Sequence, residues 1–182
     1  EQRIYRDLNL LATIVAQTGQ TSANQRDFTL PSSAGTIVVL ESVNLLNNNS
    51  RTPIVKTSRD VLDMFWPSGN AIGVLDPVNW APLTDQVIIL GPSPSGILDI
   101  ECLGTIRPAP ISASNTTTFL STQLPDLLLS AAMVAATAYQ QNWGRQADDP
   151  AMALSWENDY KARLPSAMAE ETRRRYAGWG TA

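Results

Sequence analysis

The side chains that carry most enzyme chemistry are scarce in this sequence. It contains no histidine, and it therefore lacks the commonest general base and the commonest metal ligand. Its one cysteine, Cys102, lies in an apolar, strand-like run and can form no internal disulfide, which predicts a buried reduced thiol. The sequence has neither a Gly-rich phosphate loop before a helix nor carboxylates at the spacing of a calcium loop. We therefore predict no catalytic residue, no metal site, no cofactor and no enzyme activity.

Two pairs of carboxylates come closest to a catalytic arrangement. Asp148 and Asp149 precede Pro150, a pattern typical of a helix N-cap followed by a first-turn proline. Asp99 and Glu101 share one face of a predicted strand, and a face in contact with solvent is the simpler interpretation. Both pairs are therefore interpreted as structural.

The densest positive charge is a run of arginines near the end of the chain. At the end of a helix, such a run complements the helix dipole, and it could equally contact an acidic protein surface. It is too short for a nucleic-acid site, and the net charge of −4 also argues against one. The candidate partner interface comprises this run and two aromatic residues: Arg173, Arg174, Arg175, Tyr176 and Trp179.

The elements that position these residues fall into separate blocks. Residues 1–11 predict a helix with Ile4, Leu8 and Leu11 on one face, and residues 12–107 predict mostly strands with a short helix near 58–66, capped by Ser58. The last strands, between residues 79 and 106, predict a meander. An extended linker follows at 108–122, then helices over 124–176 and a tail at 177–182. Because Glu1 is not a methionine and the first helix opens without a cap, we expect further residues upstream.

This segregated order predicts the α+β class. We expect an antiparallel β-sheet region at about residues 11–107, packed with a helical bundle formed by the N-terminal helix and the C-terminal helices. The length and the 43% hydrophobic content suit a single domain with a substantial core, placed at residues 1–176.

The most apolar segment, "LPDLLLSAAMVAATAYQQNWG", spans residues 124–144. Its unbroken apolar part is shorter than the roughly 20 residues of a membrane-spanning helix, so we predict no membrane span. A helix without a polar face is normally buried on all sides. We favour a central core helix, and the alternative is a helix shared between its own core and a neighbouring subunit. The expected core residues of this helix are Leu127, Leu128, Ala131, Ala132, Ala135 and Tyr139.

The next helix carries an apolar stripe at a spacing of four residues. The stripe comprises Met152, Trp156, Tyr160 and Leu164. Glu157 with Lys161 and Asp159 with Arg163 are predicted to form exposed ion pairs one turn apart. Pro165 is expected to kink or break this helix.

Several segments taken together resemble a known family. They are "RDFTLPSS", "TPIVKTSRDVLDMFWPSG", "QVIILGPSPSGILDIECLGTIRPAPIS", the apolar helix and "DDPAMALSWENDYKARL". In this combination and order, over roughly residues 1–176, the chain resembles the head-to-tail adaptor (connector) proteins of tailed bacteriophages. Pro165 and the tail "YAGWGTA" depart from the family pattern.

The resemblance implies a structural virion protein made in the cytoplasm of the bacterial host. It implies a homo-oligomeric, typically dodecameric ring in the neck, between the portal protein and tail or nozzle proteins, with a lumen through which DNA passes without specific binding. A negatively charged wall would repel DNA, which fits such passage. The interface residues above would then meet the portal.

A different class of function rests on the strand region. Trp66 and Trp80, if exposed, could stack on sugars in a carbohydrate- or receptor-binding virion module, although burial is the commoner fate of tryptophan. A cell-wall-degrading virion enzyme is disfavoured, because no convincing carboxylate pair is present.

Overall fold

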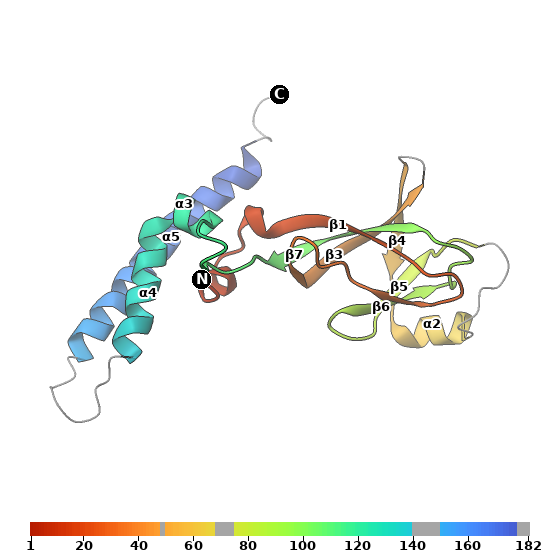
Figure 1. The fold of residues 1–182 in the computed structure, drawn as a ribbon, viewed down its shortest axis with the longest axis horizontal. Helices are drawn as coiled ribbons and strands as arrows, with labels where there is room; N and C mark the ends of the chain where they lie inside the picture. The colour runs from red at the N-terminus through yellow and green to blue at the C-terminus, as the bar shows by residue number, and fades with distance from the viewer. Residues whose placement is uncertain (48–49, 68–74, 140–149, 178–182) are drawn as a thin grey trace. The chain divides into compact units, whose positions relative to one another are not determined.

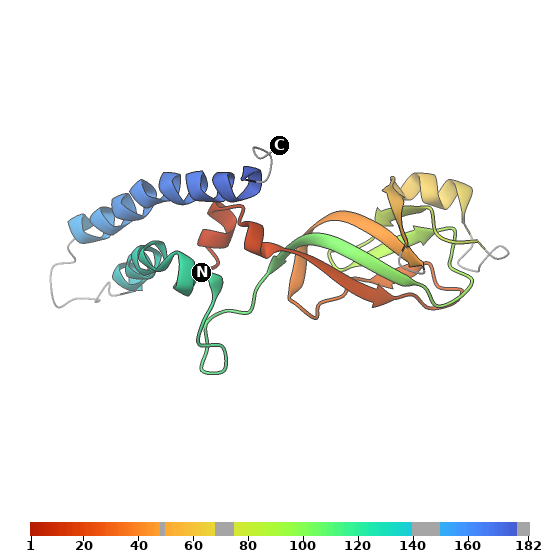
Figure 2. The same cartoon turned by 90° about the horizontal axis from the view of Figure 1, so that it is seen from above.

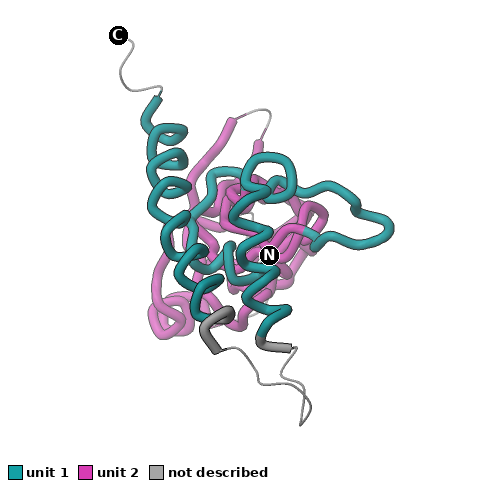
Figure 3. Tube along the Cα trace, turned by 90° about the vertical axis from the view of Figure 1, so that its left-hand side faces the viewer, with its two compact units in different colours: residues 1–12, 109–182 teal, residues 13–108 magenta. Residues whose placement is uncertain are grey.

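A computed structural model describes residues 1–47, 50–67, 75–139 and 150–177. The chain forms two compact units, shown in Figure 3: Glu1–Ala12 with Ala109–Ala182, and Thr13–Pro108. We call them the helical unit and the sheet unit, because the longer helices lie in the first and all the strands of the described chain lie in the second (Figure 1). The predicted α+β class is confirmed. A single domain over residues 1–176 stays a prediction, since it concerns how the two units associate.

The sheet unit is built on a seven-stranded sheet in the order β1-β7-β3-β4-β5-β6-β2. Every ladder is antiparallel except that between β4 and β5, which is parallel, so the predicted antiparallel sheet is in fact mixed. The strands are β1 (Ile14–Gln20), β2 (Asp27–Thr29), β3 (Thr36–Asn47), β4 (Ser50–Lys56), β5 (Asn79–Pro82), β6 (Val87–Gly91) and β7 (Asp99–Arg107).

The predicted meander of the last three strands is wrong. Only β5 and β6 pair with each other, and β7 lies between β1 and β3. The residues of β7 explain its inner position, because Ile100, Cys102 and Ile106 are buried in the main core of the unit. A strand with this many buried side chains is more stable inside a sheet, with a neighbouring strand on each side, than at the edge of the sheet.

The main core of the sheet unit is apolar and continuous. It joins Phe28, Leu30, Ile37, Val43, Leu45, Ile54, Trp80, Ile88, Leu90, Ile100, Cys102 and Ile106. One helix, α2 (Arg59–Phe65), belongs to this unit, and the Ser58 hydroxyl accepts a hydrogen bond from the Val61 amide, as predicted. Its Leu62 packs in a second cluster with Ala81, Ile89 and the partly buried Trp66.

The expectation of a solvent-facing carboxylate pair is wrong for one of its members. Glu101 is only 8% exposed, whereas Asp99 is exposed. The Glu101 carboxylate accepts hydrogen bonds from Arg51 Nη2 at 2.8 Å and Asn44 Nδ2 at 3.2 Å. A buried carboxylate needs such partners, and β3 and β4 supply them.

The helical unit is assembled from both ends of its sequence. It contains α1 (Ile4–Asp7), the first part of a 3₁₀ turn (Leu11–Thr13), α3 (Phe119–Gln123), α4 (Pro125–Tyr139) and α5 (Pro150–Tyr176). Figure 2 shows α4 and α5 side by side. Their core residues come from every part of the unit: Ile4, Tyr5, Leu8, Leu10, Leu120, Leu127, Tyr160 and Ala167.

Three predicted boundaries in this unit differ from the structure. The first helix ends at Asp7 because Leu8 adopts an extended conformation (φ −119°, ψ 132°), so Leu10 rather than Leu11 reaches the core. The predicted linker is shorter than expected, since Thr118 and Ser121 form a capping box that starts α3. Pro165 does not break α5, because Leu164 and Ala167, on either side of it, both pack against the core.

Candidate functional site

The N-terminal segment is fixed to α5 by a network of charged and aromatic groups. Arg3 donates from Nη1 and Nη2 to the two carboxylate oxygens of Glu157, at 2.8 and 2.7 Å. Its guanidinium lies 4.3 Å from the ring centroid of Tyr160, whose hydroxyl donates to Asp7 Oδ2 at 2.7 Å. The hydrogen bonds from Arg3 lower the pKa of Glu157 to about 2. The network therefore joins residues that lie 154 positions apart in sequence (Arg3 and Glu157) and 153 positions apart (Asp7 and Tyr160).

A second contact fixes the same segment near the end of α5. Glu171 is only 5% exposed. Its two oxygens accept hydrogen bonds from the Leu11 amide at 2.9 Å and from Arg174 Nη1 at 2.8 Å. The Arg174 guanidinium also lies 5.0 Å from the ring centroid of Phe119 in α3. Glu171 therefore connects the N-terminal segment to α5, and Arg174 continues the connection to α3.

The three arginines proposed from the sequence have different roles in the structure. Arg174 pairs with Glu171, and Arg175 Nη2 donates to the carbonyl and side-chain oxygens of Asn9 at 3.0 and 2.7 Å. Arg173 is exposed and forms no ion pair within the described residues. Arg174 and Arg175 thus stabilise the unit itself, while Arg173 leaves its charge available to a partner.

A groove lies beside this end of α5. Its volume is about 310 Å³, and Leu8, Met168 and Tyr176 give it apolar walls. Met168 and Tyr176 are both exposed, and Arg175 forms part of the lining. The predicted interface residues Arg175 and Tyr176 therefore border a real concavity. The side chain of Trp179 lies outside the described residues.

The apolar helix α4 has two different faces. Leu127 and Ser130 are buried, and the Ser130 hydroxyl donates to Asp159 on α5. On the opposite side Leu129 is 58% exposed, and Ala132 and Ala135 are exposed as well. The interpretation of this helix as buried on all sides by its own chain is therefore wrong.

The other residues that the sequence predicts to be in the core of the helical unit are buried to different degrees. Tyr160 is fully buried, Leu128 and Ala131 are partly buried against the core, and Trp156 is half-buried. The side chains of Tyr139 and Met152 lie outside the described residues. The two predicted ion pairs of α5 are present, at 3.2 Å for Lys161–Glu157 and 2.9 Å for Arg163–Asp159.

Sequence reasoning missed Glu171, Arg3 and Asp7. A signal for Glu171 does exist, because it continues the stripe of Tyr160, Leu164 and Ala167 at helical spacing beyond Pro165. The expected break at Pro165 hid this continuation. Arg3 and Asp7 lie one helical turn apart and form an ion pair at 3.6 Å, but this local spacing does not indicate their partners Glu157 and Tyr160 in α5.

The described residues offer little for catalysis or metal binding. Among them no group of three or more Cys, Asp or Glu side chains is placed to hold a metal ion. Burial raises the pKa of the Cys102 thiol to about 12, which leaves it protonated and unreactive. Asp148 and Asp149 lie outside the described residues. None of the described helices is both long and apolar enough to cross a membrane.

The exposed apolar side chains on α4 and α5 are typical of surfaces that bind other molecules. Comparison of the sequence with known protein families identifies the family. The whole chain, residues 1–182, matches the family described as SU10 adaptor protein, and the chain belongs to that family. A search of curated proteins found no match. The protein is thus a bacteriophage adaptor, and membership of this family implies a place in the virion neck, in association with portal and tail components.

Proposed function

We propose that this adaptor forms a homo-oligomeric ring, of dodecameric type, between the portal and the tail or nozzle proteins. The observation that carries this proposal is the exposed outer face of α4. Leu129 and the small residues Ala132 and Ala135 form an apolar surface that is exposed in the described part of the chain. Small side chains allow a second helix to approach closely, so a neighbouring copy is the natural cover for this face.

The end of α5 is the proposed contact with the portal. Arg173 offers a positive charge that forms no ion pair with the described residues, and the groove beside Met168 and Tyr176 offers exposed apolar walls. Arginine and tyrosine are among the residues that contribute most to binding energy at protein interfaces. The portal surface that fits is acidic, with an apolar side chain that fills the groove.

The proposed lumen carries DNA without binding it specifically. The net charge of −4 supports this role, because a negatively charged wall repels the phosphate backbone.

The alternative function, a carbohydrate- or receptor-binding module, loses its main support. Trp80 is only 3% exposed, and Trp66 is partly buried against Leu62, so neither offers an open ring face for a sugar.

The ring is tested by native mass measurement and by electron microscopy of the purified chain. Wild-type protein is expected to form a closed ring, and Leu129→Asp is expected to remain folded but monomeric. Val55→Asp is the matched control, because Val55 is equally exposed, at 62%, but lies on β4 in the other unit. A Leu129→Asp ring of normal size would refute the assignment of α4 to the subunit interface.

The portal contact needs a separate binding measurement with the purified portal. Arg173→Glu and deletion of residues 177–182 are both expected to weaken binding while the ring still forms. Arg59→Glu, an exposed arginine on α2 in the sheet unit, is the charge-matched control. Unchanged affinity in both variants would show that neither Arg173 nor residues 177–182 contact the portal.

A further inference from the structure

The sheet unit has an opening beside the first half of β3. On one side β3 pairs with β7 from Thr36 to Leu46, but on the other it pairs with β4 only from Val43 to Asn47. Strand β4 then meets β5 instead, at Val55 and Lys56. Within the described chain, residues 36–42 of β3 therefore have a strand neighbour on one side only.

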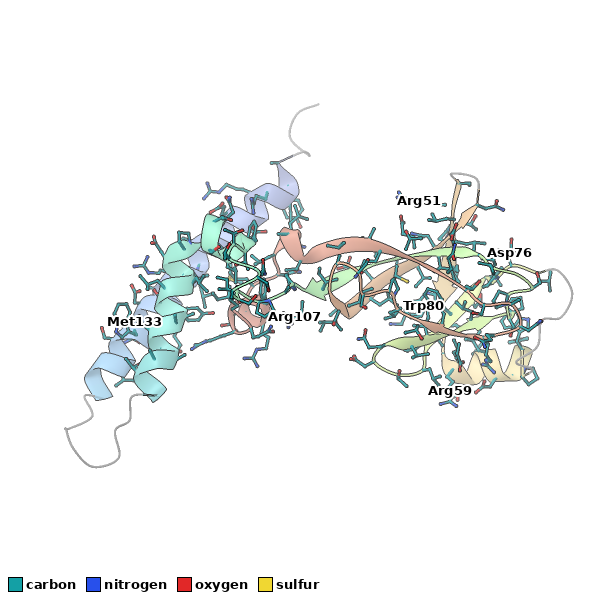
Figure 4. All side chains as sticks on the ribbon, in the orientation of Figure 1. Arg51, Arg59, Asp76, Trp80, Arg107 and Met133 are labelled. Carbon is teal, nitrogen blue, oxygen red and sulfur yellow. The ribbon has the colours of Figure 1, made fainter. Side chains whose placement is uncertain are left out.

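A hollow of about 310 Å³ lies at this opening. Val39 and Leu40 of β3 line one wall, and Lys56, Trp80 and Ile88 line the rest. Trp80 and Ile88 belong to the main core, and Figure 4 shows Trp80 among the strands of the sheet unit. Val38 and Val39 at the mouth are exposed, Val39 by 54%. The volume is at the lower end of the roughly 300–1,000 Å³ of ligand sites, which suits one or two side chains.

The backbone of β3 at this opening is able to take a strand partner. Gln86 Nε2 donates to the carbonyl of Ile37 at 3.0 Å, in the place of a neighbouring strand's amide. Apart from the ladder with β7, no backbone hydrogen bond reaches residues 38–41 within the described chain. The register shifts beside Val38 and Glu41 limit a regular ladder to a short stretch, so the fitting partner is a short extended segment.

Lys56 gives the hollow its charge preference. Its ammonium lies 5.4 Å from the ring centroid of Trp80 and forms no ion pair with any described residue. Asp85, the acidic residue of the lining, is contacted at 3.1 Å by the side-chain amide of Gln86. Lys56 therefore offers an incoming carboxylate a cation that has no ion-pair partner among the described residues.

We propose that this opening binds a short extended segment of another virion protein. The segment adds beside β3 as a strand, places an apolar side chain in the hollow against Val39 and Leu40, and pairs an acidic side chain with Lys56. Strand addition satisfies the open β3 edge with main-chain hydrogen bonds, which a docked helix cannot do because its own backbone groups are already paired. The choice of a virion protein as the partner rests on the proposed adaptor function, whereas the extended conformation rests on the β3 edge.

The test probes the purified full chain with short overlapping peptides that cover the structural proteins of its virion, this chain included. Peptides of another virion protein that carry neighbouring apolar and acidic residues are expected to bind. Lys56→Glu and Val39→Asp should each weaken that binding by about tenfold, as expected for loss of a charge pair or of apolar burial. Lys56→Arg should preserve it, and Val55→Asp, an exposed valine outside the hollow, is the matched control.

Hydrogen exchange with the bound peptide distinguishes strand addition from other binding. Exchange should slow in residues 36–42 and stay unchanged in β1, which lies at the margin of the sheet. The proposal is overturned by absence of bound peptides, by equal loss in Val55→Asp, or by unchanged exchange in residues 36–42. Binding by peptides of this chain alone would assign the opening to a second copy and also overturn it. Failure of the adaptor function would appear separately, as loss of ring formation and portal binding in the wild type.

Discussion

Glu171 offers the most direct test of how the helical unit is stabilised. Glu171→Ala removes the carboxylate that accepts from the Leu11 amide and from Arg174. A hydrogen bond to a charged group contributes about 1.5–3 kcal/mol, and the half-exposed Leu11 residue places this one at the lower end. The Arg174 pair adds about 0.5–1 kcal/mol, because the arginine side chain is partly in contact with water. We therefore expect a loss of about 2 kcal/mol in the free energy of unfolding.

The measurement is urea unfolding of the recombinant chain, followed by far-ultraviolet circular dichroism. With a urea dependence of about 1–3 kcal/mol per molar, the midpoint should fall by roughly 1 M. Glu170→Ala is the control, since it removes the same charge from the neighbouring, exposed position of α5. If the two variants lose the same free energy, Glu171 is not the connection that its burial and hydrogen bonds indicate.

Three further outcomes are expected. Ala132→Trp should leave the unfolding free energy nearly unchanged but block assembly, because Ala132 is exposed in the single chain; a destabilised monomer would show that the position is core. Glu157, whose pKa falls from 4.5 to about 2 mainly through its hydrogen bond with Arg3, should stabilise the fold above pH 4.5 and lose that effect as the pH falls toward 2. Thermal unfolding should therefore depend less on pH in this interval for Glu157→Gln, and an identical profile would contradict the pairing. Cys102, with its pKa raised to about 12 by burial, should react with thiol reagents only on unfolding, and rapid labelling of the native chain would show that it is accessible.

Features encoded by neighbouring residues were predictable from the sequence. The cap at Ser58, the ion pairs one turn apart in α5 and the burial of Cys102 each depend on a few adjacent positions. Helix spacing and strand patterns describe such features well, because they are properties of a single element.

Features that join distant segments were not predictable in this way. Nothing near Arg3 indicates Glu157, and nothing in β7 alone indicates that it separates β1 from β3. The face of α4 presents a different difficulty. Leu129 and Leu127 are the same residue type, yet one is exposed and the other buried, so residue type alone does not distinguish the two faces of the helix.

The order of the two units along the chain has a consequence for synthesis. The sheet unit, Thr13–Pro108, is inserted within the sequence of the helical unit, whose first twelve residues, Glu1–Ala12, are separated from the rest. During synthesis on the ribosome, the residues of the sheet unit are made before those of α4 and α5. Arg3 and Leu11 can form their contacts with Glu157 and Glu171 only after α5 has been synthesised.

The contacts that fix the N-terminal segment to α5 therefore form only after synthesis has passed Glu171. A chain that stops before α5 lacks the helical unit on which the proposed ring depends. For the proposed ring, completion of the helical unit would therefore act as a length check on the copies that assemble.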